Sequence, residues 1–432
     1  MIESLVAAFR IPELKRRIQY VLLMFAVFVL GAHIPAPGVN HEAVNRIFGG
    51  QNGLLGLVDA FSGGALRRMS IFALGVMPYI NATIIMQMLT MAIPQLEELS
   101  KEGEAGRKQI AKITRYMTIG LALVQAIGFS YSFGAVAHDS IFSMLQMWIS
   151  MTAGTCLLMW IGEQITEKGV GNGISLVIFA GIMTYMPFEV GTVYESVVKN
   201  LINPFNVLLL IVIFILTILG IVFVERGQRK IPIQHAKRVI GMRVTQGGSS
   251  FLPIRVDTAG VIPIIFAISL VMFPAQIFGA IPIKPTSWFA NVKNIALQMI
   301  PGNSWWGTLL YVLLIIVFTY FYTSIIMNVH DMADNLKRYG NYIPGIRPGK
   351  PTFDYLDRVV SRITLAGAIF LAAVALMQYI APQITGVTSF SLVGGISLLI
   401  VVGVAIETMQ AIESQLLMRN YEGFIKSSGI NQ

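Results

Sequence analysis

Long stretches without Asp, Glu, Lys or Arg constrain this chain more than any other feature. A bilayer core about 30 Å thick is crossed by about 20 helical residues. Nine uncharged runs reach that length, at 18–41, 69–96, 116–138, 140–162, 169–188, 200–224, 258–283, 294–330 and 363–406. The first seven predict one membrane span each.

The last two runs need dividing. The eighth opens with Pro301, Gly302, Asn303 and Ser304, so its span is expected at about 306–327. The ninth holds 44 residues and is interrupted by Pro382 and Gly386. It predicts two spans, at 363–381 and 392–410, which brings the total to ten.

The composition excludes a water-soluble protein. Only 12% of the 432 residues are charged and 55% are hydrophobic, against about 25% charged in an ordinary soluble domain. The single cysteine, Cys156, excludes an intramolecular disulfide framework and a multi-cysteine metal site.

Lys and Arg predict the orientation. With ten spans both termini share one side, and that side carries 25 of the 31 basic residues, leaving 6 on the other. Basic residues concentrate on the cytoplasmic side, so both termini are expected there. This rule also accounts for most of the net charge of +9.

The sequence thus predicts an all-α polytopic membrane protein with ten transmembrane helices. Five spans on each side of a break would make two inverted halves, although no sequence repeat links them. The expected parts are an N-terminal half at 1–188, an external connection at 189–205, a C-terminal half at 206–410 and a cytoplasmic tail at 411–432.

Two cytoplasmic loops, 225–256 and 328–362, carry seven and six basic residues. The alternating stretches of the first predict a hairpin that projects from the membrane. Their charge has two interpretations. It is a topology signal on a solvated loop, or it is a docking surface for an anionic partner such as ribosomal RNA or an acidic protein face.

The sequence shows no sign of an active site or a metal site. HExxH and the phosphate-loop motif are missing, and the five histidines are scattered singly. No span carries Asp, Glu, Lys or Arg at its centre, where a coupled transporter usually needs one. No cofactor, metal or catalytic residue is expected, and the energy for any transport would come from another protein.

Two spans contain breaking residues. In 69–96, Pro78 is expected to bend the helix because it cannot donate to the Leu74 carbonyl, and 257–274 has Pro263 in a similar setting. The polar Asn81, Thr83 and Gln87 would be interhelical hydrogen-bond partners or substrate ligands. The short apolar segment before residue 69 would be an interfacial helix or would fold back into a cavity.

Several strings make the chain resemble the SecY family, the central subunit of the bacterial protein translocase. They are IP (34–35), PG (37–38), FSGGA (61–65), SIFALG (70–75), MPYI (77–80), KEGE (101–104), GEQITE (162–167), GNGIS (171–175), VERGQR (224–229), AGVIP (259–263), PGIRPG (344–349) and LIVV (399–402). The resemblance covers nearly the whole chain and implies two pseudo-symmetric halves around a central hourglass pore.

The resemblance also implies residue roles. An aliphatic constriction would be formed by Val76, Ile80, Ile178, Ile265 and Ile400, where Val76 is smaller than the usual isoleucine and would loosen the seal. A plug at about 57–66 would fill the outer funnel, through Leu57, Val58, Phe61, Ser62, Gly63 and Gly64. Without the resemblance, the five aliphatic residues would be taken as core or lipid-facing side chains.

The spans 69–96 and 257–274 would face each other as a lateral gate, with polar contacts from Gln87 and Asp257. Asp257 departs from the asparagine expected there, so its charge would alter the closed state or pair with a base. The basic loops would receive the SecA motor ATPase or the ribosome through Arg229, Lys230, Lys237, Arg238 and Arg347. SecE would clamp the two halves, and SecG and anionic lipid are further expected partners.

The resemblance implies a protein-conducting channel for unfolded secretory polypeptides, which releases signal and transmembrane segments sideways into lipid. The alternative is a secondary transporter of a small solute, also built from inverted repeats with broken helices. The missing central charge and the large basic loops favour the channel.

Overall fold

The structure is a computed structural model that describes residues 9–39, 59, 61–133, 141–235, 238–240, 243–245, 248–280, 288–302, 304–387 and 395–427. Its helices are α2 (Pro12–His33), α5 (Met77–Ala92), α6 (Pro94–Lys101), α7 (Glu104–Phe133), α8 (Ile141–Lys168), α9 (Gly173–Val198), α10 (Pro204–Glu225), α11 (Ile262–Ala280), α12 (Trp288–Gln298), α13 (Trp305–Ile326), α14 (Val329–Arg338), α15 (Lys350–Thr385) and α16 (Gly395–Ser427). Its strands are β1 (Gln228–His235), β2 (Arg238–Ile240), β3 (Arg243–Thr245), β4 (Ser249–Arg255) and β5 (Asn341–Tyr342).

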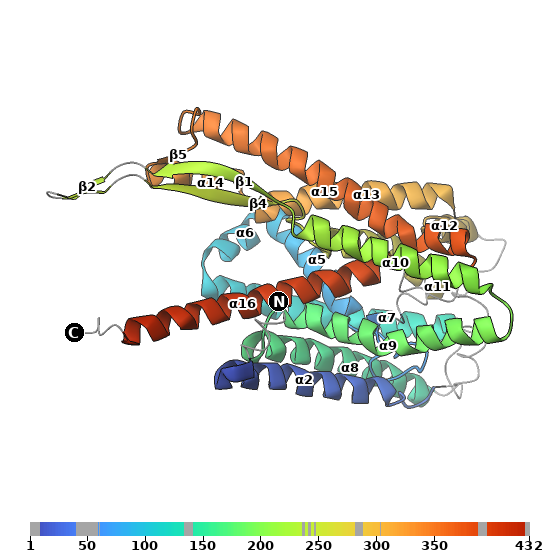
Figure 1. Ribbon diagram of the computed structural model, residues 1–432. Coiled ribbons are helices and arrows are strands. Elements are labelled where there is room, and N and C mark those ends of the chain that lie inside the picture. Colours follow the sequence, from blue (N-terminus) through green and yellow to red (C-terminus); the bar gives the residue numbers. More distant parts are fainter. Residues whose placement is uncertain are drawn as a thin grey trace.

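The long helices lie side by side as a bundle, and the strands project beyond one of its ends together with the C-terminal end of α16 (Figure 1). One large hydrophobic core runs through the bundle and takes side chains from both halves of the chain, among them Phe28, Met151, Ile265 and Leu399. Many other large apolar side chains face outward, such as Phe223 on α10, as expected where the surrounding solvent is lipid.

Each of the ten predicted spans corresponds to a helix. Within the described part of the chain, seven helices are long and apolar enough to cross a membrane, namely α7, α8, α9, α10, α13, α15 and α16. The other three predicted spans are α2, which starts among basic residues, and the shorter helices α5 and α11. The chain is a multi-pass membrane protein.

The prediction of a single bent helix over 69–96 is wrong. Residues 69–76 form buried turns, with φ of +46° at Met69 and +57° at Gly75, and α5 begins only at Met77. Pro78 therefore lies in the first helical turn, where its missing N–H costs nothing, and it starts the helix instead of bending it. Pro263 has the same place at the start of α11.

The short α5 explains why the turns before it are buried. Its 16 residues rise about 24 Å at 1.5 Å each, which is less than the bilayer core. Non-helical backbone is tolerated at membrane depth only where protein or a water-filled cavity surrounds it. Residues 61–76 meet that condition inside the bundle.

The expected connection at 189–205 is shorter than predicted. The helix α9 continues to Val198 through Pro187, and α10 begins at Pro204, capped by the Asn203 side chain. Only residues 199–203 lie between the two helices. The hinge role of this connection stays a prediction.

The predicted hairpin in 225–256 is present, since β1 pairs antiparallel with β4, with Ile231 opposite Leu252. The second basic loop joins it, because β5 pairs with the end of β1. A separate hydrophobic core holds the two loops together, and its buried members are Ile231, Ile254, Val329, Ile343, Leu356, Val359 and Val360. We call this assembly of β1, β4, β5, α14 and the start of α15 the cytoplasmic unit, after the side of the membrane on which its two loops are predicted to lie.

Candidate functional site

Five aliphatic side chains meet at the centre of the bundle. Val76 caps α5 and Ile80 lies in its first turn, while Ile178, Ile265 and Ile400 come from α9, α11 and α16. All five line one cavity of about 10 Å³, which holds at most about one water molecule. The elements that carry them are far apart in sequence and come from both halves of the chain.

The lining of this cavity is almost entirely apolar. Its other members are Phe61, Ser62, Leu74, Gly75 and Met77. Leu74, Gly75 and Met77 were missed from the sequence, although all three lie within two residues of the predicted Val76. Val76 is only 3% exposed, so its short side chain leaves no more than this small space. The closure is one that resists wetting while empty.

The segment that closes the cavity on one side is the predicted plug. Phe61, Ser62, Gly63 and Gly64 are all buried, whereas Leu57 and Val58 lie outside the described residues. The fold-back interpretation of this segment is thus the one that the structure supports, and the interfacial helix is not. Whether the segment moves as a plug stays a prediction.

Short-range hydrogen bonds give this segment its shape. The Asp59 carbonyl accepts from the Gly64 N–H at 2.8 Å and from the Ser62 hydroxyl at 2.9 Å. The Asp59 carboxylate accepts from the Arg67 N–H at 2.8 Å. Further along, the N–H of Ile71 donates to Ile34 just after α2, at 3.0 Å. The segment is therefore held at both ends.

Close backbone approach fixes its position against α9. A Cβ atom on Gly181 would lie 2.5 Å from the Phe61 carbonyl oxygen, and one on Gly63 would lie 3.3 Å from the Gly181 Cα. Gly63 also has φ of +71°, which favours glycine. Two glycines far apart in sequence thus let the segment lie directly on the helix that carries Ile178.

The predicted gate lies where α5, α7 and α11 meet. The helix α11 packs more extensively on α7 than on α5, so α7 belongs to this seam and was missed from the sequence. Each of these helices carries one buried side-chain atom that has no hydrogen-bond partner in the described structure, the Gln87 Oε1, Gln125 Nε2 and Ser269 Oγ. Such unpaired atoms cost free energy while the seam is closed.

Gln87 and Asp257 are not joined by a hydrogen bond among the described residues. Asp257 lies between β4 and α11, where its Oδ1 accepts from the Gly260 N–H at 2.8 Å and its Oδ2 has no partner. Nor does a described basic side chain pair with it. Burial raises the pKa of Asp257 to about 6, against the lowering effect of the Gly260 hydrogen bond, and the negative charge of Glu407 raises it as well.

Asp257 has two carboxylate neighbours that were missed from the sequence, Glu225 and Glu407. Glu225 ends α10, and its Oε1 would lie 3.5 Å from a Cβ atom on Gly403 of α16. The Oε1 of Glu407 on α16 would lie 3.9 Å from a Cβ atom on Gly260. The positive charge that acts on both glutamates is Arg255, which also donates to Gln410 at 2.8 Å.

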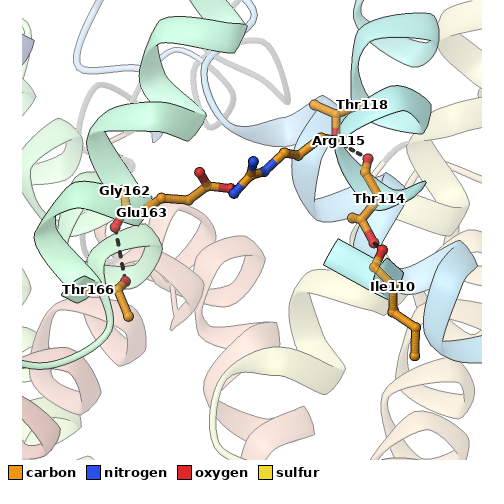
Figure 2. A network of polar contacts seen from close by, with 7 residues as sticks. All are labelled: Ile110, Thr114, Arg115, Thr118, Gly162, Glu163 and Thr166. Carbon is orange, nitrogen blue, oxygen red and sulfur yellow. Dashed lines mark hydrogen bonds and ion pairs between the residues drawn. The ribbon is translucent and has the colours of Figure 1, made fainter. Parts of the chain in front are cut away.

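A polar network ties α7 to α8 beside this seam (Figure 2). The Arg115 Nε on α7 donates to the Glu163 Oε1 on α8 at 2.8 Å, and both side chains are partly exposed. Thr166, one turn after Glu163, bonds the Gly162 carbonyl and accepts from the Gly173 N–H that opens α9. The network joins three helices of the N-terminal half, of which α7 packs on α11.

Most predicted partner-binding residues lie on the cytoplasmic unit and are solvent-exposed. Arg229 and Lys230 are on β1, and Arg347 lies in the turn between β5 and α15, where its carbonyl accepts from Thr352. Arg238 is in β2, and Lys237 lies outside the described residues. The nearby Phe251, on β4, is also exposed.

Known proteins match this chain along its length. The SecY family model matches residues 70–409. The protein translocase subunit SecY of Halalkalibacterium halodurans is 43% identical over 99% of this chain and 100% of that protein. The subunit of the same name from Staphylococcus aureus strain NCTC 8325 is 42% identical over 98% and 99%.

Solved structures share the fold. One described as a protein-conducting channel has a TM-score of 0.63 at 17% identity and covers 94% of this chain and 96% of its own. Sec61 in the canine ribosome–channel complex has a TM-score of 0.60 at 16% identity, with the same coverage. These matches set aside the small-solute transporter, because translocase subunits account for the whole chain. The chain belongs to the SecY family, a family of protein-conducting channels and not of enzymes.

Proposed function

We propose that this chain is the pore of a protein translocase, which passes unfolded secretory polypeptides across the cytoplasmic membrane. The main support for the proposal is the constriction, where five aliphatic side chains from both halves of the chain surround a cavity of about 10 Å³. A passing chain offers every kind of side chain in turn. Uncharged, flexible side chains can close around all of them without binding any tightly.

The buried residues 61–66, the described end of the predicted plug, act as the resting stopper. Phe61 and Ser62 line the constriction itself, so a polypeptide cannot pass while they stay in place. The hydrogen bonds of this segment are mostly internal, to Asp59, Ser62 and Ala65. It can therefore leave the pore as a unit without breaking the helices around it.

The seam between α11 and the pair α5 and α7 serves as the lateral gate for signal and transmembrane segments. The unpaired polar atoms of Gln87, Gln125 and Ser269 make the closed seam less stable than an apolar one would be. Two elements on the other side of the seam, α13 and α15, move with α11, because α11 packs on both.

Partner proteins supply the energy for transport and hold the two halves of the chain together. The cytoplasmic unit receives the ribosome or the SecA motor through Arg229, Lys230, Lys237, Arg238 and Arg347. Support comes from the solved neighbours, which include a yeast Ssh1 complex bound to the 80S ribosome and Sec61 in a ribosome–channel complex. SecE holds the two halves together, and SecG and anionic lipid complete the assembly.

The membrane is the bacterial cytoplasmic membrane, with both termini in the cytoplasm. The names and sources of the relatives support the first statement. The distribution of 25 basic residues against 6 supports the second.

The decisive experiment is a photocrosslink from a probe at Ile265 to a secretory chain arrested in transit, in membranes that hold the partner proteins. We expect a crosslink that depends on the arrested chain. Ile369 on α15, which is more than half exposed, carries the control probe and should stay silent. Silence from Ile265, Ile80 and Ile400 together, on a verified intermediate, would overturn the proposal.

A further inference from the structure

The end of the bundle opposite the strands contains a pocket that the channel function does not use. It measures about 470 Å³ and is lined by His33, Pro35, Gly64, Arg67, Arg68, Tyr185 and Phe188. That volume lies within the range of small-molecule sites, about 300–1,000 Å³. Its members come from the end of α2, from the plug segment and from α9.

Arg67 is held in place from several directions. Its guanidinium carbon lies 4.7 Å from the centre of the Phe188 ring, a cation–π contact. Its own N–H bonds the Asp59 carboxylate. A guanidinium held in one orientation loses little conformational entropy when it binds an anion.

The Arg68 side chain lies beside Gly64 and Tyr185 in the same pocket. Its guanidinium carbon would lie 3.8 Å from a Cβ atom on Gly64, and the Tyr185 ring would lie 3.3 Å from that atom. Neither arginine forms an ion pair with a carboxylate of the described residues. The carboxylates nearest by, Asp59 and Glu189, are buried and are not among the lining residues.

His33 also lines the pocket. Its Nδ1 lies 2.8 Å from the Val29 carbonyl oxygen. A carbonyl can only accept, so Nδ1 carries the proton.

The topology rule does not explain the two arginines. Only 6 of the 31 basic residues lie on this side of the membrane by the predicted orientation, and basic residues are disfavoured there. Two of the six are adjacent and line one pocket. Guanidinium groups bind tetrahedral oxyanions through paired N–H bonds, and two of them with a histidine match a phosphate better than a carboxylate.

We propose that His33, Arg67 and Arg68 form a binding site for a phosphate group at the outer mouth of the pore. The group is inorganic phosphate or the phosphate of an anionic lipid headgroup. Because Arg67 and Arg68 follow Phe61 and Ser62 in one segment, the bound phosphate ties that segment to α2 and α9. Binding therefore favours the conformation in which the segment fills the pore.

The test uses the purified chain with its partner subunits in detergent, titrated with inorganic phosphate and followed by ³¹P NMR line broadening and by melting temperature. We expect saturable binding in the range of about 0.1–1 mM. Arg67→Gln with Arg68→Gln should weaken it by about tenfold or more, and Arg67→Lys with Arg68→Lys should weaken it less. Lys199→Gln, an exposed change on the same side, is the matched control.

A second arm replaces detergent by nanodiscs of phosphatidylglycerol or of phosphatidylcholine. A higher melting temperature only in phosphatidylglycerol, lost in the glutamine variants, assigns the site to the lipid headgroup. Saturable binding of phosphate alone assigns it to the free ion. If the double variant does not fold, Arg68→Gln alone replaces it, because Arg68 is exposed. Equal effects of phosphate and of chloride at matched ionic strength, or equal binding by the variants, overturn the proposal.

Discussion

The constriction and the cytoplasmic unit are both built around aliphatic side chains, but they use them in opposite ways. In the unit, Leu356 and its neighbours pack into a closed core that holds exposed basic residues in position. In the constriction, Ile80 and Ile265 surround a space that a polypeptide must enter. The first group stabilises a fold, whereas the second forms a closure that has to open.

This difference predicts which property each substitution changes. Loss of a side chain from the unit should lower stability and leave the membrane barrier intact. Loss of a side chain from the constriction should open the barrier with little effect on the unit. The loop that contains Asp257 joins the two regions and should respond to pH.

The largest effect is expected for the constriction. Ile80→Gly with Ile265→Gly removes two side chains, each contributing about 1.5–3 kcal/mol of apolar contact. Ion leak through the resting channel in liposomes should rise by about a hundredfold. The lipid-facing pair Ile215→Gly and Ile369→Gly is the control, since both residues are at least half exposed. An unchanged leak would refute the role of the ring.

Leu356→Ala tests the other side of the comparison. Leu356 is fully buried in the core of the cytoplasmic unit, and such a truncation costs about 2–5 kcal/mol. The unit should become protease-sensitive in β1 and β4 at lower denaturant concentration, while the resting ion leak stays at the wild-type level. A large leak in this variant would mean that the two regions are not independent.

Asp257→Asn should change the pH dependence of stability. The pKa of Asp257 is raised from 3.8 to about 6, so the folded state favours the protonated form. The contribution of Asp257 to the free energy of unfolding is present below about pH 4 and is lost as the pH rises through 6. This loss of stability amounts to at most about 3 kcal/mol. The variant should match the wild type near pH 4 and be more stable at pH 7.

The measurement for Asp257 is the melting temperature of both proteins in detergent between pH 4 and pH 8. The Asn side chain can still accept from Gly260, so the loop geometry is kept. Two parallel curves would show that Asp257 does not titrate in this range.

Arg347→Glu should have the smallest effect. Exposed charge pairs contribute about 1 kcal/mol or less, so transport at limiting SecA or ribosome concentration should fall about fivefold, more at low salt. Membrane insertion of the chain and resting leak should not change. Lys199→Glu, which makes the same change in charge at the opposite end of the bundle, serves as control. Normal transport in the Arg347 variant would make Arg347 a topology signal only.

Much of this protein could be predicted from its sequence, because the lipid environment makes hydropathy decisive. A run of about 20 uncharged residues is most stable as a helix within the lipid bilayer, so each of the ten predicted spans has a helix. The five ring residues could be named only through the resemblance to the SecY family. Taken alone, Ile178 or Ile400 reads as any other buried aliphatic residue.

The tertiary structure decided what depends on contacts between distant segments. Only packing around residues 69–76 allows α5 to begin at Met77, since an exposed break there would leave backbone groups unpaired in lipid. The loops 225–256 and 328–362 form one unit only because Ile231 and Leu356 pack in a shared hydrophobic core. The approach of Glu225 and Glu407 to Asp257 likewise depends on how three elements pack. Hydropathy is a property of neighbours along the chain, whereas these features come from residues that meet only after folding.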